Sequence, residues 1–405
     1  MKLLKTVAVF TVFVLICTFV CRALMPKVEQ YPLPEIPEIP SEQTEMRDYS
    51  DFAKGEPIFS DVSVGAKSAL LCTSDGLLIY EKNADVPLPM ASITKLMTVI
   101  CALEAITDVK AEVLVPDKAI GIEGSSVYLA KGERVTYEML LYSAMLESAN
   151  DATTALAIIC GGSEESFVSK MNEKAKALSM NNTHFCNPHG LHENEHYTTA
   201  RDYVKLMSYA LENEQLCDII ATKKITFAKL DNSMMRVLTN HNRLLFTYKG
   251  MLGGKTGFTK TSGRTLITAA KRNDTTLICI TLNDGSDWHD HTALLDRGFE
   301  TVKTVCYDKI NATVPIGAGN SESLSVKMQN RFSFSVLNGE QITYKISLPH
   351  IAFAPIKKDE QIGKIDFYKD GKIICTVPLL AEDTVEQKIE NNKGFLEKLR
   401  DFILN

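Results

Sequence analysis

Ser92 and Lys95 lie three residues apart in the segment PMASITKLMTVICALE, residues 89–104. The apolar side chains of residues 96–103 predict a largely buried helix that begins near Ser92. Burial of an ammonium group costs several kcal/mol unless the group is paired or loses its proton. Residues at i and i+3 share one helix face, so a neutral Lys95 amine could remove the proton of the Ser92 hydroxyl. The pair therefore predicts a serine nucleophile with a lysine base.

Two further motifs follow in order and supply other groups that such a reaction needs. The sequence SAN, residues 148–150, lies in a loop of a predicted helical region, and KTG, residues 255–257, lies on a predicted strand after two glycines. Lys255 would be a second cation that lowers the pKa of Lys95. Together with Thr256, it would also hold a substrate carboxylate.

The remaining residues of the SAN and KTG motifs can each be assigned a role in the reaction. Ser148 could pass a proton to the leaving amine, while Asn150 orients Lys95 and the substrate amide. Gly257 would let a substrate backbone lie close beside the strand, as when a peptide adds to a sheet edge. Backbone N–H groups at the helix start near Ser92 would face the developing oxyanion.

Each motif also has a simpler structural interpretation. Ser92 could cap a helix, and Lys95 could extend along the surface to water. Residues 148–151 could form a helix-capping loop, and residues 255–257 could be the end of a strand. The three motifs in this order and in fitting contexts favour a single catalytic site, because several convergent roles are filled at once.

The predicted elements bring these motifs together around one sheet. Two strand-like runs flank residues 75–76 and predict a hairpin, and helical periodicity dominates residues 92–216. Strand patterns return within residues 236–283, two of them joined through residues 273–274, and a helix follows up to Val305. Such a chain can close one antiparallel sheet from both ends while its helices form a second lobe.

The two ends of the chain differ in character from this region. Residues 1–26 carry two lysines before an apolar run and predict an export signal, either cleaved or kept as an anchor. Residues 27–57, rich in proline and acids, predict an extended linker, and residues 58–308 form the expected catalytic domain. Residues 309–388 alternate apolar and polar side chains and predict a small all-β domain. Residues 389–405 predict an amphipathic helix that packs on its own domain or lies on a membrane surface.

Composition limits the class of protein. The 405 residues carry a formal net charge of −6, and seven acidic against two basic residues lie between residues 27 and 51. An acidic chain argues against a nucleic-acid partner, which usually calls for a basic patch.

Ten cysteines occur, two of them in the export segment, and no C-x-x-C spacing is present. Buried free thiols are favoured over a disulfide network, although export would permit disulfides.

A competing motif is HENEH, residues 192–196, which matches the H-E-x-x-H pattern of zinc peptidases. Such a motif binds zinc when both histidines lie on one helix face. Asn187, Pro188 and Gly190 interrupt the chain just before it, and no apolar stripe flanks it. A polar loop is therefore the favoured interpretation, with a zinc site as the alternative.

The region from residue 63 to residue 305 resembles the low-molecular-mass penicillin-binding proteins, specifically the serine-type D-alanyl-D-alanine carboxypeptidases. The resemblance lies in the three motifs and in the longer blocks ASITKLMT, LLYSAMLESANDA, FVSKMNEKAKALSM, THFCNPHGLHENEHYTTARD, TNHNRLL and GGKTGFT. It implies an α/β fold of the β-lactamase and transpeptidase type, in which an antiparallel sheet packs with a helical lobe. The β-rich tail resembles the family's C-terminal module, and the terminal amphipathic segment resembles its membrane-associating end.

The resemblance also implies roles for single residues. Ser92 would be the acyl-ester nucleophile, Lys95 the proton acceptor, Ser148 the second active-site serine and Lys255 the contact to the substrate carboxylate. The backbone N–H groups of Ser92 and Phe258 would form the oxyanion hole.

Two positions depart from the family pattern. His241 in TNHN stands where some relatives carry arginine, and the loop NDGSDWHDH lacks an arginine that others have there. Carboxylate contacts beyond Lys255 are therefore left open, and this role is not assigned to Arg243.

The implied enzyme is exported, acts in the cell wall or at the outer face of the cytoplasmic membrane, and removes the terminal D-alanine of peptidoglycan stem peptides that end in D-Ala-D-Ala. β-Lactam antibiotics would acylate the same serine, a terminal segment would contact the membrane surface, and no metal or organic cofactor is implied. A serine β-lactamase would share the fold, but no convincing equivalent of the class A deacylation loop is found. A penicillin-binding scaffold with an inactive site is the non-enzyme alternative, which the intact set of reactive groups disfavours.

Overall fold

The computed structural model describes residues 47–228 and 235–388. The expected export segment, residues 1–26, and the expected amphipathic helix, residues 389–405, lie outside the described residues, as does most of the expected linker. Within the two described ranges, no helix is both long enough and apolar enough to cross a membrane.

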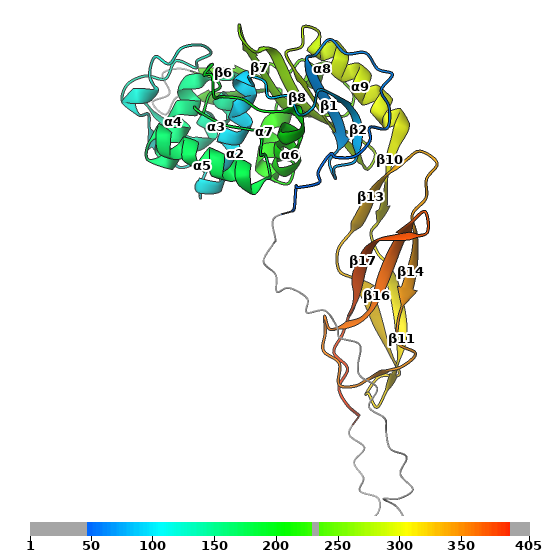
Figure 1. Cartoon of the computed structure of the whole chain (residues 1–405). Coiled ribbons are helices and arrows are strands. Elements are labelled where there is room, and N and C mark those ends of the chain that lie inside the picture. Colours follow the sequence, from blue (N-terminus) through cyan, green and yellow to red (C-terminus); the bar gives the residue numbers. More distant parts are fainter. Residues whose placement is uncertain (1–46, 229–234, 389–405) are drawn as a thin grey trace, which may run out of the picture. The chain divides into compact units, whose positions relative to one another are not determined.

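A five-stranded antiparallel sheet organises the first part of the described chain (Figure 1). Its strand order is β2-β1-β9-β8-β7, so the two earliest strands join the three latest ones, and β7 forms one edge. The hairpins predicted at residues 75–76 and 273–274 are confirmed. The strands span Ser68–Thr73 (β1), Leu78–Lys82 (β2), Met251–Thr259 (β7), Gly263–Arg272 (β8) and Thr275–Leu282 (β9).

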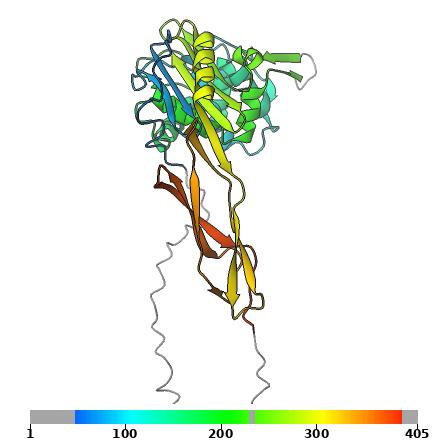
Figure 2. The ribbon, with the colours of Figure 1, turned by 90° about the vertical axis from the view of Figure 1, so that its right-hand side faces the viewer.

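Helices pack on both faces of this sheet. Figure 2 shows α9 across the near face of the sheet, and α6 contacts β1, β8 and β9 from the helical lobe behind it. The helical elements are η1 (Ala91–Thr94), α2 (Lys95–Ala105), η2 (Asp117–Ala119), α3 (Tyr137–Leu146), α4 (Asn150–Gly161), α5 (Glu164–Ala177), α6 (Ala200–Ala210), α7 (Glu214–Ala221), α8 (Leu244–Thr247) and α9 (Asp287–Thr301). Two short hairpins are formed by β3 (Glu112–Leu114) with β4 (Arg134–Thr136), and by β5 (Lys224–Ala228) with β6 (Met235–Thr239).

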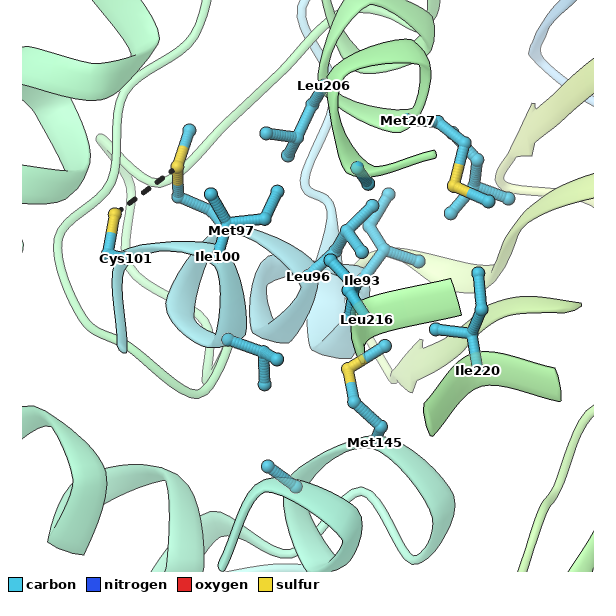
Figure 3. Packing of buried hydrophobic residues seen from close by; sticks show 14 of the residues in the cluster. Ile93, Leu96, Met97, Ile100, Cys101, Met145, Leu206, Met207, Leu216 and Ile220 are labelled. Atoms are coloured by element: carbon cyan, nitrogen blue, oxygen red, sulfur yellow. Dashed lines mark hydrogen bonds between the residues drawn. The ribbon is translucent and has the colours of Figure 1, made fainter. Parts of the chain in front are cut away.

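Helix α2 lies at the centre of the helical lobe. Every residue from Lys95 to Leu103 is buried, which explains why this helix is apolar on all sides rather than along one stripe. Figure 3 shows Leu96 and Ile100 of α2 within a cluster to which α3, α6 and α7 contribute Met145, Leu206, Leu216 and Ile220. Because a close-packed core tolerates little displacement, α2 is a rigid support for the residues at its start.

A separate β-rich region follows and has its own core. Its six-stranded sheet has the order β14-β16-β17-β12-β11-β15, and β10 pairs with β13 in a two-stranded sheet. The apolar cluster includes Val326, Ile365, Phe367 and Leu379, all buried. The strands span Val302–Tyr307 (β10), Asn311–Gly317 (β11), Ser323–Met328 (β12), Phe332–Leu337 (β13), Thr343–Ser347 (β14), Ala352–Phe353 (β15), Gln361–Lys369 (β16) and Lys372–Ala381 (β17).

Two predicted boundaries differ from the structure. The last helix of the first region ends at Thr301, and residues 302–307 form strand β10 instead of continuing the helix to Val305, because they pair with β13. Tyr49 and Phe52, which the sequence placed in the linker, are buried in the larger core with their rings 5.4 Å apart. The packed chain therefore begins before residue 58.

Candidate active site

Ser92 lies in a 3₁₀ turn, η1, and not in the first turn of an α-helix as the sequence predicted. Ala91 enters this turn with φ of 51°, a left-handed conformation that is unfavourable for a residue with a Cβ atom. Buried side chains bind the carbonyls of the turn: Thr265 Oγ1 donates to Met90 O at 3.0 Å, and Tyr203 Oη donates to Ile93 O at 2.5 Å. The surrounding structure thus holds a strained turn in place.

The Lys95 amine is fully buried beside the Ser92 hydroxyl. Its Nζ lies 3.0 Å from Ser92 Oγ and donates to the carbonyl of His189 at 2.5 Å. Burial, and secondly the positive charge of Lys255, hold the pKa of Lys95 well below its usual value, while Asp151 acts in the opposite direction. A neutral amine at hydrogen-bond distance from a hydroxyl can accept the hydroxyl proton.

A second buried amine faces a second serine. Lys255 Nζ lies 3.0 Å from Ser148 Oγ and also donates to Thr256 O at 2.8 Å. Burial lowers the pKa of Lys255 to about 7. Ser148 has φ of 57°, so the turn that carries it is also held in a left-handed conformation. The two lysines and the two serines therefore form two amine–hydroxyl pairs.

Both serines open onto one cavity of about 300 Å³. Its wall also contains the exposed ring of Phe258 at the edge of the sheet. The cavity is lined by Ser92, Ser125, Ser148, His241, Thr256, Gly257, Phe258, Arg264, Asp287 and Trp288. Of the eight residues predicted to act at the site, Lys95, Asn150 and Lys255 are not among the lining residues, because they are buried behind it.

Gly257 is required by a close approach of two backbone segments. A Cβ atom at this position would overlap Thr265 Oγ1 and would lie 2.9 Å from the backbone nitrogen of Ser92. The glycine thus lets strand β7 lie against the turn that carries Ser92. The backbone N–H of Ser92 is consequently held beside Gly257 of the edge strand.

Asn150 has a structural partner that the sequence did not indicate. It begins α4, and its side-chain nitrogen donates to the carbonyl of Glu123 at 2.5 Å. The neighbouring Asp151 carboxylate accepts hydrogen bonds from Ser126 Oγ at 2.7 Å and from Leu129 N at 3.0 Å. Together the two residues fix the segment that carries Ser125 to the cavity wall. The predicted orientation of Lys95 by Asn150 stays a prediction.

Sequence reasoning missed Ser125 and the group formed by Arg264, Asp287 and Trp288. The Arg264 guanidinium lies 2.8 Å from an Asp287 carboxylate oxygen and 5.1 Å from the centre of the Trp288 ring. Strand pairing offered a signal for Arg264, because the tight turn after the KTG strand places it opposite Phe258. His241, the departure noted in TNHN, lies 3.2 Å from a carboxylate oxygen of Glu147.

The HENEH segment lies in a loop and not in a helix. His192 is exposed whereas His196 is buried, so the two imidazoles do not share one surface. In the ranges that the structure describes, no group of three or more histidine, cysteine or carboxylate side chains could hold a metal ion.

Comparison with known proteins places this arrangement in a family. The model of the D-alanyl-D-alanine carboxypeptidase family matches residues 54–286, more than half of the chain. The chain belongs to this family. A second model, the C-terminal domain of penicillin-binding protein 5, matches residues 299–387. The predicted family, the serine-type D-Ala-D-Ala carboxypeptidase class and the two-part fold are therefore confirmed.

Several members of the D-alanyl-D-alanine carboxypeptidase family match over most of their length. The D-alanyl-D-alanine carboxypeptidase DacF of Bacillus subtilis is 30% identical over 81% of this chain and 88% of its own length. DacC of Escherichia coli is 31% identical over 84% of this chain and 88% of its own length. Penicillin-binding protein 5 of Haemophilus influenzae, at 24% identity, shares the fold with a TM-score of 0.64 over 81% of this chain and 100% of its own. The Streptomyces K15 DD-transpeptidase, at 30% identity, has a TM-score of 0.56 over 60% of this chain and 99% of its own.

Proposed function

We propose that this carboxypeptidase removes the terminal D-alanine of peptidoglycan stem pentapeptides by acylation of Ser92, and that β-lactams acylate the same residue. The observation that carries the proposal is the fully buried Lys95 amine, 3.0 Å from the Ser92 hydroxyl. A buried lysine that has lost its proton is a base, and a serine needs one to become a nucleophile.

Acylation uses the first amine–hydroxyl pair. Lys95 takes the proton of Ser92 while Oγ attacks the carbonyl carbon of the penultimate D-alanine. The oxyanion that forms receives hydrogen bonds from the backbone N–H groups of Ser92 and Phe258, which the contact between β7 and η1 brings together. The C–N bond then breaks, and the penultimate residue remains as an ester on Ser92.

The second pair serves the leaving group and the carboxylate. Ser148 passes its proton to the nitrogen of the departing D-alanine and receives the proton that Lys95 took from Ser92, so that Lys95 is neutral again. Lys255 stabilises the hydroxyl oxygen of Ser148 at 3.0 Å. Lys255 and Thr256 hold the terminal carboxylate, with the Lys255 charge favoured further by the bound anion. A water molecule later attacks the ester, Lys95 takes the water proton, and Ser92 leaves with a proton to regenerate the enzyme.

The enzyme is proposed to act outside the cell, at the outer face of the membrane or in the wall. The support is the charge and apolar pattern of residues 1–26 and the composition of the linker that follows. The proposed organisation has a catalytic domain up to about residue 308, an all-β domain at 309–388 and a membrane-contacting terminal segment at 389–405. The buried Tyr49 and Phe52 extend the catalytic domain toward the N-terminus.

Mass spectrometry tests the nucleophile. We expect the chain lacking residues 1–26 to gain the mass of one benzylpenicillin and to release D-alanine from a pentapeptide ending in D-Ala-D-Ala. Ser92→Ala should do neither, because it has no hydroxyl beside Lys95. Ser125→Ala, which removes another serine of the same cavity, should still gain the penicillin mass.

Other outcomes would favour the alternatives. Penicillin uptake by Ser92→Ala would contradict the proposal. Chelator-sensitive release of D-alanine by that variant would favour a zinc peptidase. An adduct that disappears within seconds, without D-alanine release from the peptide, would favour a β-lactamase.

A further inference from the structure

The loop from Cys186 to His196, called loop 186–196 below, closes onto the turn that carries Ser92. It includes the whole HENEH motif, residues 192–196, to which the reaction steps above give no role. The carbonyl of His189 accepts a hydrogen bond from Lys95 Nζ. A Cβ atom at Gly190 would overlap the Ala91 carbonyl, so the loop backbone lies directly against the turn. The far end of the loop makes a third contact with the turn, between His196 and Thr94.

Hydrogen bonds around His196 fix which of its nitrogens carries the proton. The backbone N–H of Cys186 donates to His196 Nδ1 at 3.0 Å, so Nδ1 is an acceptor without a hydrogen. The proton of the neutral imidazole is therefore on Nε2, which lies 2.8 Å from Thr94 Oγ1. The Thr94 hydroxyl in turn donates to the carbonyl of Ala91 at 2.6 Å. The chain of donors runs in one direction, from the loop to the turn.

The surroundings keep His196 in this neutral form. Its side chain is 2% exposed, and the ring of Phe185 packs edge-on with a centroid separation of 5.9 Å. Burial, followed by the positive charges of His184, His192 and Lys95, lowers the pKa of His196 to about 3. A protonated imidazole would point a second N–H at the Cys186 N–H, so the neutral form is the one that fits the loop.

The end of this chain is the strained residue next to the nucleophile. Ala91 has φ of 51°, and its peptide group provides the backbone N–H of Ser92. Rotation of that peptide group would move both the Ala91 carbonyl and the Ser92 N–H. The hydrogen bond from Thr94 to the carbonyl therefore also fixes the direction of the N–H that faces the oxyanion.

We propose that His196 is a positioning residue for the reaction: through Thr94 it holds the Ala91 peptide, and so keeps the Ser92 hydroxyl and backbone N–H in the geometry that acylation requires. This inference rests on the proposed role of Ser92 as nucleophile. It gives the second histidine of HENEH a function that involves no metal. His196 acts through Thr94 and does not contact the substrate.

Threonine variants test the link between His196 and the turn. Thr94→Val keeps the shape of the side chain and removes its hydroxyl, whereas Thr94→Ser keeps the hydroxyl. We expect the maximal rate of acylation by benzylpenicillin to fall about 10- to 100-fold in Thr94→Val, as when one oxyanion donor is misplaced. The penicillin concentration that gives half the maximal rate should change little, and Thr94→Ser should retain most of the rate.

The chain offers a matched control in a second buried threonine–histidine pair. Thr268 Oγ1 lies 2.9 Å from Nδ1 of the buried His291, between the sheet and α9. Thr268→Val should lower the melting temperature as Thr94→Val does, because both leave a buried imidazole nitrogen unpaired. It should leave the maximal acylation rate near that of the wild type. Equal acylation rates in Thr94→Val and Thr268→Val would overturn the inference.

Histidine variants provide a second comparison if Thr94→Val does not fold. His196→Gln offers one acceptor and one donor in place of the imidazole, whereas His196→Leu offers neither. The glutamine variant should acylate at least several-fold faster than the leucine variant, and equal rates in the two would overturn the inference. Wild-type protein that takes up no penicillin would instead refute the proposed function, and this inference with it.

Discussion

At the scale of single residues, the site contains two buried amines whose pKa values are lowered by different sets of causes. Lys95 has the more strongly lowered pKa because the charge of Lys255 adds to its burial. Lys255, whose pKa is lowered only to about 7 by burial, keeps its proton more readily. One lysine can therefore act as a base while the other remains a cation for the carboxylate. The same residue type fills two roles because the two environments differ.

This charge coupling predicts the pH dependence of a Lys255→Gln variant. Acylation needs the neutral form of Lys95, so the rate rises as pH increases through the pKa of Lys95. Removal of the Lys255 charge raises that pKa toward its usual value, so the acid side of the profile should move to higher pH. The measurement is the maximal rate of acylation by benzylpenicillin from pH 5 to pH 9.

Lys205→Gln is the matched control for this variant. Lys205 is also buried, but its amine is paired with Asp202 at 3.2 Å and lies on α6. Its replacement should lower stability and leave the midpoint of the pH profile unchanged. A midpoint in Lys255→Gln equal to that of the wild type would contradict the coupling.

At the scale of elements, the proposed reaction depends on the contact between the edge strand β7 and the turn η1. The two elements are far apart in sequence and belong to different parts of the fold, the sheet and the start of the helical lobe. The two elements lie close together at Gly257, where a Cβ atom would lie 2.9 Å from Ser92 N. Any side chain there must push the strand away from the nucleophile.

Gly257→Ala is therefore predicted to impair the reaction more than the fold. We expect kcat/KM for D-alanine release to fall about 100-fold, which is typical for a displacement of about 1 Å between reacting groups. Gly285→Ala is the control, because a Cβ atom at Gly285 would have no neighbour within 4 Å. Steady-state kinetics on both variants, with circular dichroism spectra for folding, checks the prediction. Activity near the wild-type level in Gly257→Ala would show that strand and turn can separate without cost.

Local sequence patterns predicted the helices and strands. Most contacts between these elements join residues far apart in the sequence, and they were not predicted. The hairpin through residues 273–274 and the buried helix after Ser92 were visible because their signals are local: turn residues and apolar periodicity. Three reactive motifs in order predicted the convergence of two serines with two lysines. The partner of Asn150 was not predictable, because Glu123 offers only a backbone carbonyl, which any residue carries.

Two further misses have the same physical origin. Residues 302–307 continue a helix-compatible pattern, and only their pairing with a strand about thirty residues later makes them extended. His196 was visible only as part of a metal-binding pattern, whereas the role proposed for it depends on contacts with Cys186 and Thr94. Tertiary contacts therefore determine both the extended conformation of residues 302–307 and the surroundings of His196.

At the scale of the whole molecule, the described chain combines separate apolar cores with thiols that have no disulfide partner. The eight described cysteines form no disulfide bond, as favoured by their scattered spacing, although five of them are only half-buried. Burial raises the pKa of Cys101 to about 12 and that of Cys279 well above its usual value. These two thiols therefore remain protonated and unreactive near neutral pH.

Buried neutral histidines predict that the protein loses stability in acid. Burial, as the largest cause, lowers the pKa of His189, His196 and His291 to about 3 each, against a usual value near 6.5. Between these values the unfolded chain binds protons that the folded chain does not. The free energy of unfolding therefore reaches its full value above pH 6.5 and decreases as the pH falls toward 3. At pH 5 each histidine accounts for a loss of about 2 kcal/mol.

His291 allows this prediction to be tested away from the active site, because it lies on α9 and its ring contacts Thr268 and Thr281 of the sheet. Urea unfolding at pH 7.5 and pH 5.0 gives the loss of unfolding free energy in each variant. His291→Gln should reduce that loss by about 2 kcal/mol, since its amide does not titrate. His289→Gln replaces a histidine of the same helix whose side chain is 84% exposed, and it should leave the loss unchanged. An equal loss in all three proteins would mean that His291 is protonated as easily in the folded chain as in the unfolded one.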